Sequence, residues 1–344
     1  MRKRTRYSLL LALVVLAALV VAVVLRKSAP PEAARLLPES DAILYVNVRP
    51  LRTLTHFDRT VVARSPEFQQ FIDATGIVPE RDLNAVAFAL HRMDDPHGPN
   101  GPVAYSEVFE GSFDGTRLRS YLGSIATAQE TYAGHTIYSV AVGASEATAK
   151  GDKRVAVPQR VLRIAQLGYD TVAASNMPTA EQIHSILDRY RAGASPFSGS
   201  SLLSERYRDV PLLSSGWAIG RIGLPFSESG KITVLGLQLP LPEDTTFVGS
   251  LRYVGAIHLR IDEIAPSPAD AAASAATLEN LLRVFQSIQK LQQPTPENAA
   301  FMEAVGTIKI VQHEERAEMT ATVPVDLLRQ LTTPEASAAP VLEP

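Results

Sequence analysis

Alternating apolar and polar residues, interrupted by capped helical patterns, extend along most of the chain. Residues 41–48 (DAILYVNV) are a β-branched and aromatic run bounded by prolines, which predicts a strand. Further on, Ser65 precedes Pro66, apolar residues share one helical face, and Gly76 follows. This is typical of a helix with an N-cap, a proline in its first turn and a glycine stop.

From residue 83 onward, one order of elements recurs three times: two extended runs, a capped helix and a further extended segment. The three copies cover residues 83–140, 160–223 and 245–323. Strands that alternate with single helices in this order favour an α+β fold. We therefore expect a largely antiparallel sheet, or sheets, with helices on one face, and a subdivision of the folded region near residues 155 and 243.

The helices of these copies have apolar positions at helical spacing. The first carries Leu118, Tyr121 and Leu122. The second follows a capping box of Thr179 and Gln182, and its apolar residues are Ile183, Ile186, Leu187 and Tyr190. The third begins with Ser267 and Pro268, and its predicted buried stripe is Leu278, Leu281, Leu282, Phe285 and Ile288.

Residues 308–323 (IKIVQHEERAEMTATV) have the pattern of a hairpin with a charged turn. The register that aligns the apolar positions pairs Lys309, Ile310 and Val311 with Thr320, Met319 and Glu318. Because Glu-Glu lacks the positive-φ preference of a two-residue turn, we expect a four-residue loop over residues 313–316. The charged residues of this loop are expected to be solvated.

An uninterrupted apolar run at residues 9–25 predicts a membrane anchor. Its 17 residues span about 25 Å as a helix, and four cations without an acid precede it. We expect a cytoplasmic N-terminus (1–7), a transmembrane segment (8–25), a linker (26–35), an extracytoplasmic region (36–331) and a disordered tail (332–344), in a single-pass inner-membrane protein. A cleaved secretory signal is the alternative, although its apolar region is normally shorter.

The charge outside the first 27 residues is acidic. Six of the 33 Lys and Arg residues lie in those 27, which hold no acid, so 27 bases face 36 acids in the remainder. An acidic surface is a poor match for phosphate backbones, so nucleic acid is not an expected partner. The chain also has no cysteine, which excludes disulfides, cysteine metal sites and lipid attachment to cysteine.

Four residues are weak surface candidates for chemistry. The strand pattern at 256–264 places His258 and Asp262 on one face, but their spacing of about 13 Å favours a solvated face over a catalytic pair. Asp94 and His97 lie in DDPHGPNG, where oxygen and nitrogen ligands are available. The prolines and glycines of this stretch favour a hairpin loop over a calcium site.

Other motifs give no site. The chain lacks an H-E-x-x-H zinc motif, a G-x-S-x-G elbow and a G-x-G-x-x-G turn, so we expect no cofactor and no catalytic residues. The single tryptophan, Trp217, lies in an apolar run and is expected to anchor the core.

The segments 163–190, 216–223 and 307–328 together resemble a layout of poorly characterised bacterial proteins, which have an N-terminal anchor and an extracytoplasmic α+β domain. The resemblance covers about half of the chain and assigns no functional residues.

These observations favour a membrane-anchored binding or scaffolding protein of the cell envelope, not an enzyme, with a protein or cell-wall partner. One alternative is a lipid or lipoprotein carrier or chaperone with an apolar groove, which residues 224–242 could line. The other is an envelope hydrolase.

Overall fold

The structure is a computed structural model. It describes residues 29–59, 64–98, 100–142, 160–193, 199–221, 231–234, 237–240, 245–291, 299–324 and 327. The predicted transmembrane segment (8–25) and the predicted tail (332–344) lie outside these residues. Among the described helices, none combines the length and the apolar character needed to cross a bilayer.

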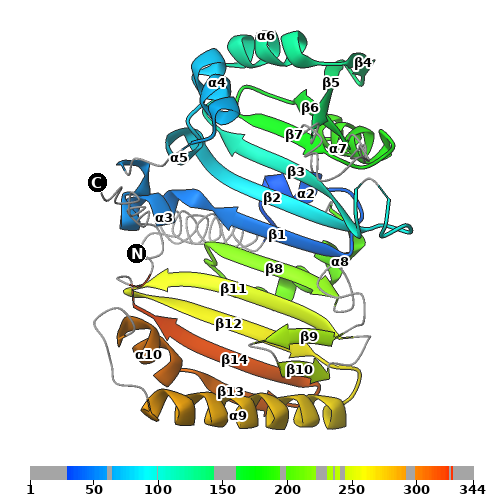
Figure 1. Cartoon of the computed structure of the whole chain (residues 1–344). Coiled ribbons are helices and arrows are strands. Elements are labelled where there is room, and N and C mark those ends of the chain that lie inside the picture. The colour runs from blue at the N-terminus through cyan, green and yellow to red at the C-terminus, as the bar shows by residue number, and fades with distance from the viewer. Residues whose placement is uncertain are drawn as a thin grey trace, which may run out of the picture.

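One antiparallel sheet of 12 strands runs through the described part of the chain (Figure 1). In the order in which they pair, the strands are β13 (Lys309–His313), β14 (Arg316–Val323), β12 (Ala256–Ile264), β11 (Thr246–Val254), β8 (Gly216–Arg221), β1 (Ala42–Asn47), β2 (Leu83–Arg92), β3 (Val103–Gly111), β7 (Thr171–Ser175), β6 (Arg160–Gln166), β5 (His135–Val142) and β4 (Ala128–Tyr132). The α+β class and the antiparallel sheet predicted from the sequence are confirmed.

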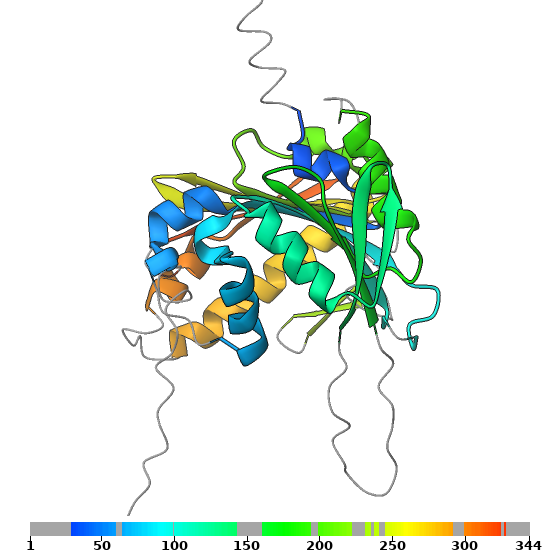
Figure 2. The same ribbon diagram turned by 90° about the horizontal axis from the view of Figure 1, so that it is seen from above.

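Helices cover both faces of this sheet, so the prediction that they lie on one face is wrong (Figure 2). We call the face toward the viewer in Figure 1 the front face. It carries α3 (Val48–Thr55), α4 (Pro66–Thr75), α6 (Gly115–Ile125), α9 (Pro268–Leu291) and α10 (Ala299–Gly306). The rear face carries α2 (Glu32–Leu36), α7 (Glu181–Arg191) and α8 (Ser201–Arg206).

Short connecting elements complete the described chain. These are α5 (Pro79–Asp82) and the two 3-10 turns η1 (Phe57–Arg59) and η2 (Tyr207–Asp209). A separate hairpin of β9 (Lys231–Val234) and β10 (Leu237–Pro240) lies on the same side of the sheet as α9 (Figure 2). The rest of segment 224–242 lies outside the described residues.

Two apolar cores result because adjacent strand residues point to opposite faces. In β7, Ala173 belongs to the rear core beneath α7, whereas Val172 belongs to the front core beneath α6. In the same way Ile137 of β5 faces the rear and Tyr138 the front. Strands β5 and β7 are therefore buried on both faces, so an alternation of apolar and polar residues does not mark a solvent-exposed face here.

The predicted start and end of α4 are confirmed. Ser65 Oγ accepts a hydrogen bond from Phe68 N at 3.3 Å, and Gly76 ends the helix with φ of 73°. Phe71 packs edge-on against Tyr121 of α6, with 5.6 Å between ring centroids. This contact joins the two helices over the front core.

Helix α7 buries Ile183, Ile186 and Leu187, as its spacing predicts. The predicted capping box is wrong, because the helix starts at Glu181 after Ala180, and no side chain caps it. Burial of the apolar stripe on the rear face, not a cap, therefore holds this helix in place.

The long helix α9 begins as predicted, with Ser267 Oγ accepting a hydrogen bond from Asp270 N at 3.2 Å. Its predicted stripe is only half-buried at Leu278, Leu281, Leu282 and Phe285, and the side chain of Ile288 lies outside the described part. Full burial occurs instead one to two turns earlier, at the small residues Ala271, Ser274 and Ala275. Small side chains let the helix approach the sheet closely, while its larger residues stay near the edge.

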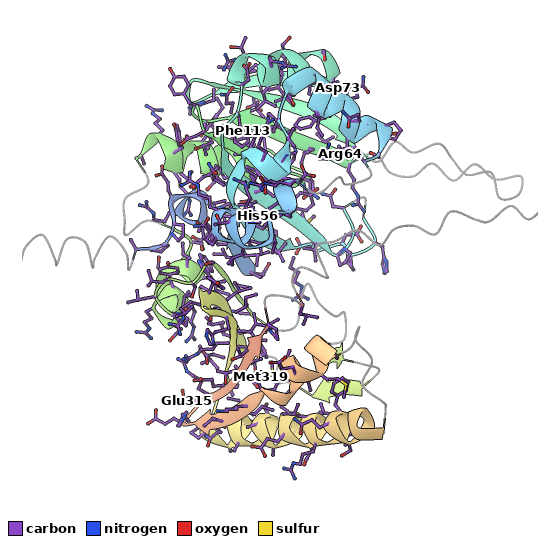
Figure 3. The ribbon with its side chains drawn as sticks, turned by 90° about the vertical axis from the view of Figure 1, so that its left-hand side faces the viewer. His56, Arg64, Asp73, Phe113, Glu315 and Met319 are labelled. Carbon is purple, nitrogen blue, oxygen red and sulfur yellow. The ribbon has the colours of Figure 1, made fainter. Side chains whose placement is uncertain are left out.

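The hairpin of β13 and β14 has the predicted register, with Ile310 opposite Met319 and Val311 opposite Glu318. The predicted four-residue loop is wrong. His313 still pairs with Arg316, and Glu314 adopts φ of 51° to complete a two-residue turn. Figure 3 shows Glu315 at the outer end of the hairpin, with Met319 further in, near α9.

Candidate functional site

An apolar groove lies on the front face, over the middle of the sheet. Its floor is formed by β1, β8, β11 and β12, which run side by side in Figure 1, and its volume is about 320 Å³. This size is within the usual range for small-molecule sites in proteins. Large apolar side chains face it from the strands: Leu44, Val46, Leu251, Leu259 and Ile261.

Small residues on the central strands leave the groove open. Gly249 of β11 lies between Ala218 of β8 and Ile261 of β12 in the sheet register. A Cβ atom added at Gly249 would meet no other atom within 4 Å. Because nothing fills this position, the apolar neighbours stay accessible, with Leu44 37% and Ile261 38% exposed.

Helix α3 forms one wall of the groove through Pro50, Leu51 and Leu54. Asn47, the last residue of β1, caps the helix, because its Oδ1 accepts a hydrogen bond from Arg49 N at 3.1 Å. Arg52, on the same helix, donates to Glu80 O at 2.8 Å and also to Leu83 O. The wall is thus tied to the start of β2, and its position relative to the floor is fixed.

The lining of the groove determines which ligands it can accept. Among the described residues that line it, there is no carboxylate and no histidine, and Arg260 is the one charged residue. Arg260 already bonds to Asp262 and Glu318. An apolar chain can be buried here without leaving a charge unpaired, whereas a charged ligand would lose its hydration without gaining a partner.

Asp262, a candidate from the sequence, is not on a solvated face. It is 0% exposed and accepts hydrogen bonds from Arg260 Nε at 3.0 Å and from Arg316 Nη1 at 3.2 Å. Arg316 also donates to Asp209 of η2 at 2.8 Å. The expectation that Arg316 is solvated is therefore wrong, because it joins a buried ion network that ties η2 to β12 and β14.

The other sequence candidates lie far apart in the fold. His258 faces Thr322 on the rear face, with 3.5 Å between Nδ1 and the hydroxyl oxygen. Asp94 and His97 lie in the loop between β2 and β3, where His97 N donates to Asp95 Oδ1. In the described ranges, no three His, Asp or Glu side chains are grouped so that they could hold a metal ion.

A buried polar chain that no sequence motif predicted joins three strands. His91 Nε2 lies 3.0 Å from Ser106 Oγ, which lies 3.0 Å from Ser175 Oγ. Burial lowers the pKa of His91, and Ser106 is 0% exposed. These side-chain contacts connect β2, β3 and β7. Solvent does not reach the Ser106 hydroxyl, so its hydrogen-bond partners are these side chains. The alternation of β2, with His91 following Ala87 and Ala89, is the signal for this burial.

A second unpredicted group is Glu107 of β3, on the front face between Phe88 and Ala174 in the register. Burial raises the pKa of this carboxyl to about 7. Its placement could not be read from the sequence, because the apolar surroundings come from strands distant in the chain.

Trp217 occupies the rear core, as the sequence predicts, and is 2% exposed. Its ring stacks on Tyr45 at 5.6 Å between centroids and meets Tyr207 edge-on at 5.3 Å. Trp217 is also among the residues that line the groove. Its ring therefore anchors β8, one of the strands of the groove floor, from behind.

Comparisons with known proteins give no family. No family model and no curated protein matches the chain. Among solved structures, crystal form III of the treponemal protein TP0453 has a TM-score of 0.46 and 11% identity, covering 88% of this chain and 98% of its own. Crystal form IV of that protein has a TM-score of 0.43 and 11% identity, covering 89% and 98%. Similarity at this level carries no functional inference.

Removing Arg316 should destabilise the fold, because Asp262 stays buried with Arg260 as its remaining partner. We expect Arg316→Ala to lower the free energy of unfolding by about 2–3 kcal/mol. This is less than the destabilisation caused when a buried charge loses all of its partners. Urea denaturation measures this change. Arg283→Ala, at an exposed helical ion pair, is the control and should change stability by less than about 0.5 kcal/mol. Equal effects would show that the network has no special role.

Glu107 should make stability depend on pH. Because its pKa is raised in the folded state, that state binds more protons than the unfolded chain between pH 4.5 and about 7. Stability then falls as the pH rises through this window. We expect Glu107→Gln to remove this loss and to be more stable than the wild type at pH 8. Between pH 4.5 and pH 8, the stability of the variant relative to the wild type should rise by on the order of 2 kcal/mol.

The control for this comparison is Glu303→Gln, a change at an exposed carboxyl. It should leave the pH dependence of urea denaturation unchanged. If Glu107→Gln retains the full pH dependence of the wild type, the burial of Glu107 does not cause it.

Proposed function

We propose that the protein is a membrane-anchored, extracytoplasmic binding protein of the cell envelope, and that its groove holds an acyl chain of a membrane lipid. The groove on the front face is the observation that supports this proposal. It favours the lipid-carrier alternative among the sequence-based hypotheses, because a scaffold needs no open apolar channel in the middle of its sheet.

The energetics of burial are compatible with this role. Each methylene group removed from water contributes about 0.8 kcal/mol. About six to eight methylenes in the groove would therefore contribute on the order of 5–6 kcal/mol before the cost of ordering the chain. A lining without carboxylates or histidines among its described residues supports binding over hydrolysis.

The predicted anchor would keep the groove close to a source of lipid. Helix α2 begins at Glu32, so about six residues separate it from the predicted transmembrane segment at 8–25. At 3.3–3.6 Å per residue, this linker spans about 20 Å at most. The folded part would then stay within reach of the acyl chains of the outer leaflet.

Filling the groove should block lipid binding. We expect full-length wild type, reconstituted in vesicles with phospholipids that carry a diazirine in the acyl chain, to crosslink at residues of β1, β11 and β12 on illumination. Gly249→Phe should reduce this crosslinking at least about tenfold, because a ring there occupies space that is now empty.

Gly249→Ala is the matched control, since it adds a side chain at the same backbone position but fills little of the groove. It should crosslink as the wild type does, and both variants should keep the wild-type circular dichroism spectrum. Crosslinking that Gly249→Phe leaves unchanged would contradict the proposal. Crosslinks between two copies of the chain across the groove would show that a second copy occupies it instead.

A further inference from the structure

A second cavity lies on the rear face, behind the same end of the sheet. Its volume is about 370 Å³, and its floor consists of rear-facing residues of β11, β12, β14 and β13. Pro211, in the loop after η2, closes one side. This cavity is opposite in character to the groove, because cations and hydroxyl groups line it.

Three cations and one carboxylate line this cavity: Arg252, Arg260, Lys309 and Glu318. Glu318 pairs with Arg260 at 3.1 Å, and Arg260 also bonds to the buried Asp262. Arg252 and Lys309 are exposed, and neither has an ion-pair or hydrogen-bond partner within the described part of the chain. Two positive charges thus face one cavity in an extracytoplasmic region whose net charge is negative.

Neutral hydrogen-bonding groups lie between these two cations. Ser250, Thr320 and Thr322 line the cavity, together with His258, whose Nδ1 is 3.5 Å from the Thr322 hydroxyl oxygen. Hydroxyl groups can donate to an anion, and a neutral imidazole can do the same from one ring nitrogen. The donors come from three adjacent strands and are therefore held by the sheet.

The spacing of the charges favours a multivalent anion. Arg252 is on β11 and Lys309 on β13, with β12 and β14 between them, and the register offsets them by two residues along the strands, so about 16 Å separates their backbones. A carboxylate offers two oxygens and one negative charge, whereas a phosphate monoester offers three free oxygens and close to two negative charges, which better match two cations and several hydroxyl donors.

We propose that this rear cavity binds the phosphate group of a phosphate ester, with Arg252 and Lys309 as the charged contacts and the hydroxyls of Ser250, Thr320 and Thr322 as donors. A soluble phosphate monoester and a phospholipid headgroup both present phosphate oxygens to such a site; the monoester offers three free oxygens and close to two charges, and the phospholipid diester offers two free oxygens and one charge. The site is separate from the acyl-chain groove, because the two open on opposite faces of the sheet.

Titration calorimetry tests this site in the full chain. The protein is kept in maltoside micelles, which contain no phosphate, and is titrated with glycerol 3-phosphate. We expect saturable binding by the wild type and at least about tenfold weaker binding by Arg252→Glu and by Lys309→Glu, because each replaces attraction with repulsion. Both positions are exposed and unpaired, so thermal unfolding should stay at the wild-type temperature.

Arg92→Glu is the matched control, since it makes the same change of charge at an exposed position outside the cavity. Its affinity for glycerol 3-phosphate should equal that of the wild type. Adding phosphatidylglycerol to the micelles identifies the source: competition with glycerol 3-phosphate indicates a lipid headgroup, and its absence indicates a soluble ester.

The proposal is overturned if the wild type shows no saturable binding, if the two cavity variants bind as the wild type does, or if Arg92→Glu weakens binding equally. Gly249→Phe separates this proposal from that of the acyl-chain groove. It should leave the binding of glycerol 3-phosphate unchanged, and Arg252→Glu should leave acyl-chain crosslinking unchanged.

Discussion

The pairing of β8 with both β1 and β11 is the interaction on which the rest of the structure depends. It sets Ala42 opposite Gly220 and Gly249 opposite Ala218, so the two halves of the chain share one hydrogen-bonded sheet. The groove exists only because of this pairing. Strand β1, from one half of the chain, forms part of its floor, and β11 and β12, from the other half, form the rest. A chain in which the halves folded separately would have no such groove.

The central strands are packed unequally on their two faces. Behind them, the stacked rings of Tyr45 and Trp217 fill the rear core beneath α2 and α8. In front of them, glycine and alanine leave the floor open between α3 and the helices at the C-terminal end of the sheet. Tight packing on one face therefore fixes the strands that present an accessible apolar surface on the other.

Local signals in the sequence predicted much of the fold. Ser65 and Gly76 set the ends of α4, and the apolar alternation of Ile310 and Met319 set the hairpin register, because each depends on neighbours in the chain. The sequence did not predict which face the helices would cover. It also failed at Asp262 and Arg316, which pair with each other, because Arg316 is held in addition by Asp209 from a distant turn. The groove was equally hidden, because the space at Gly249 results from strands that meet only in the folded sheet.

Trp217 offers the most direct test of the central claim, that an acyl chain lies in the groove. It is the single tryptophan of the chain, and its ring packs in the rear core directly behind a strand of the groove floor, so its fluorescence reports on this part of the sheet alone. Phospholipids brominated along the acyl chain quench tryptophan only at short range. We predict that they quench Trp217 in the full-length protein in vesicles, and that Gly249→Phe restores the emission. Emission that brominated lipids leave unchanged in the wild type would contradict an acyl chain in the groove.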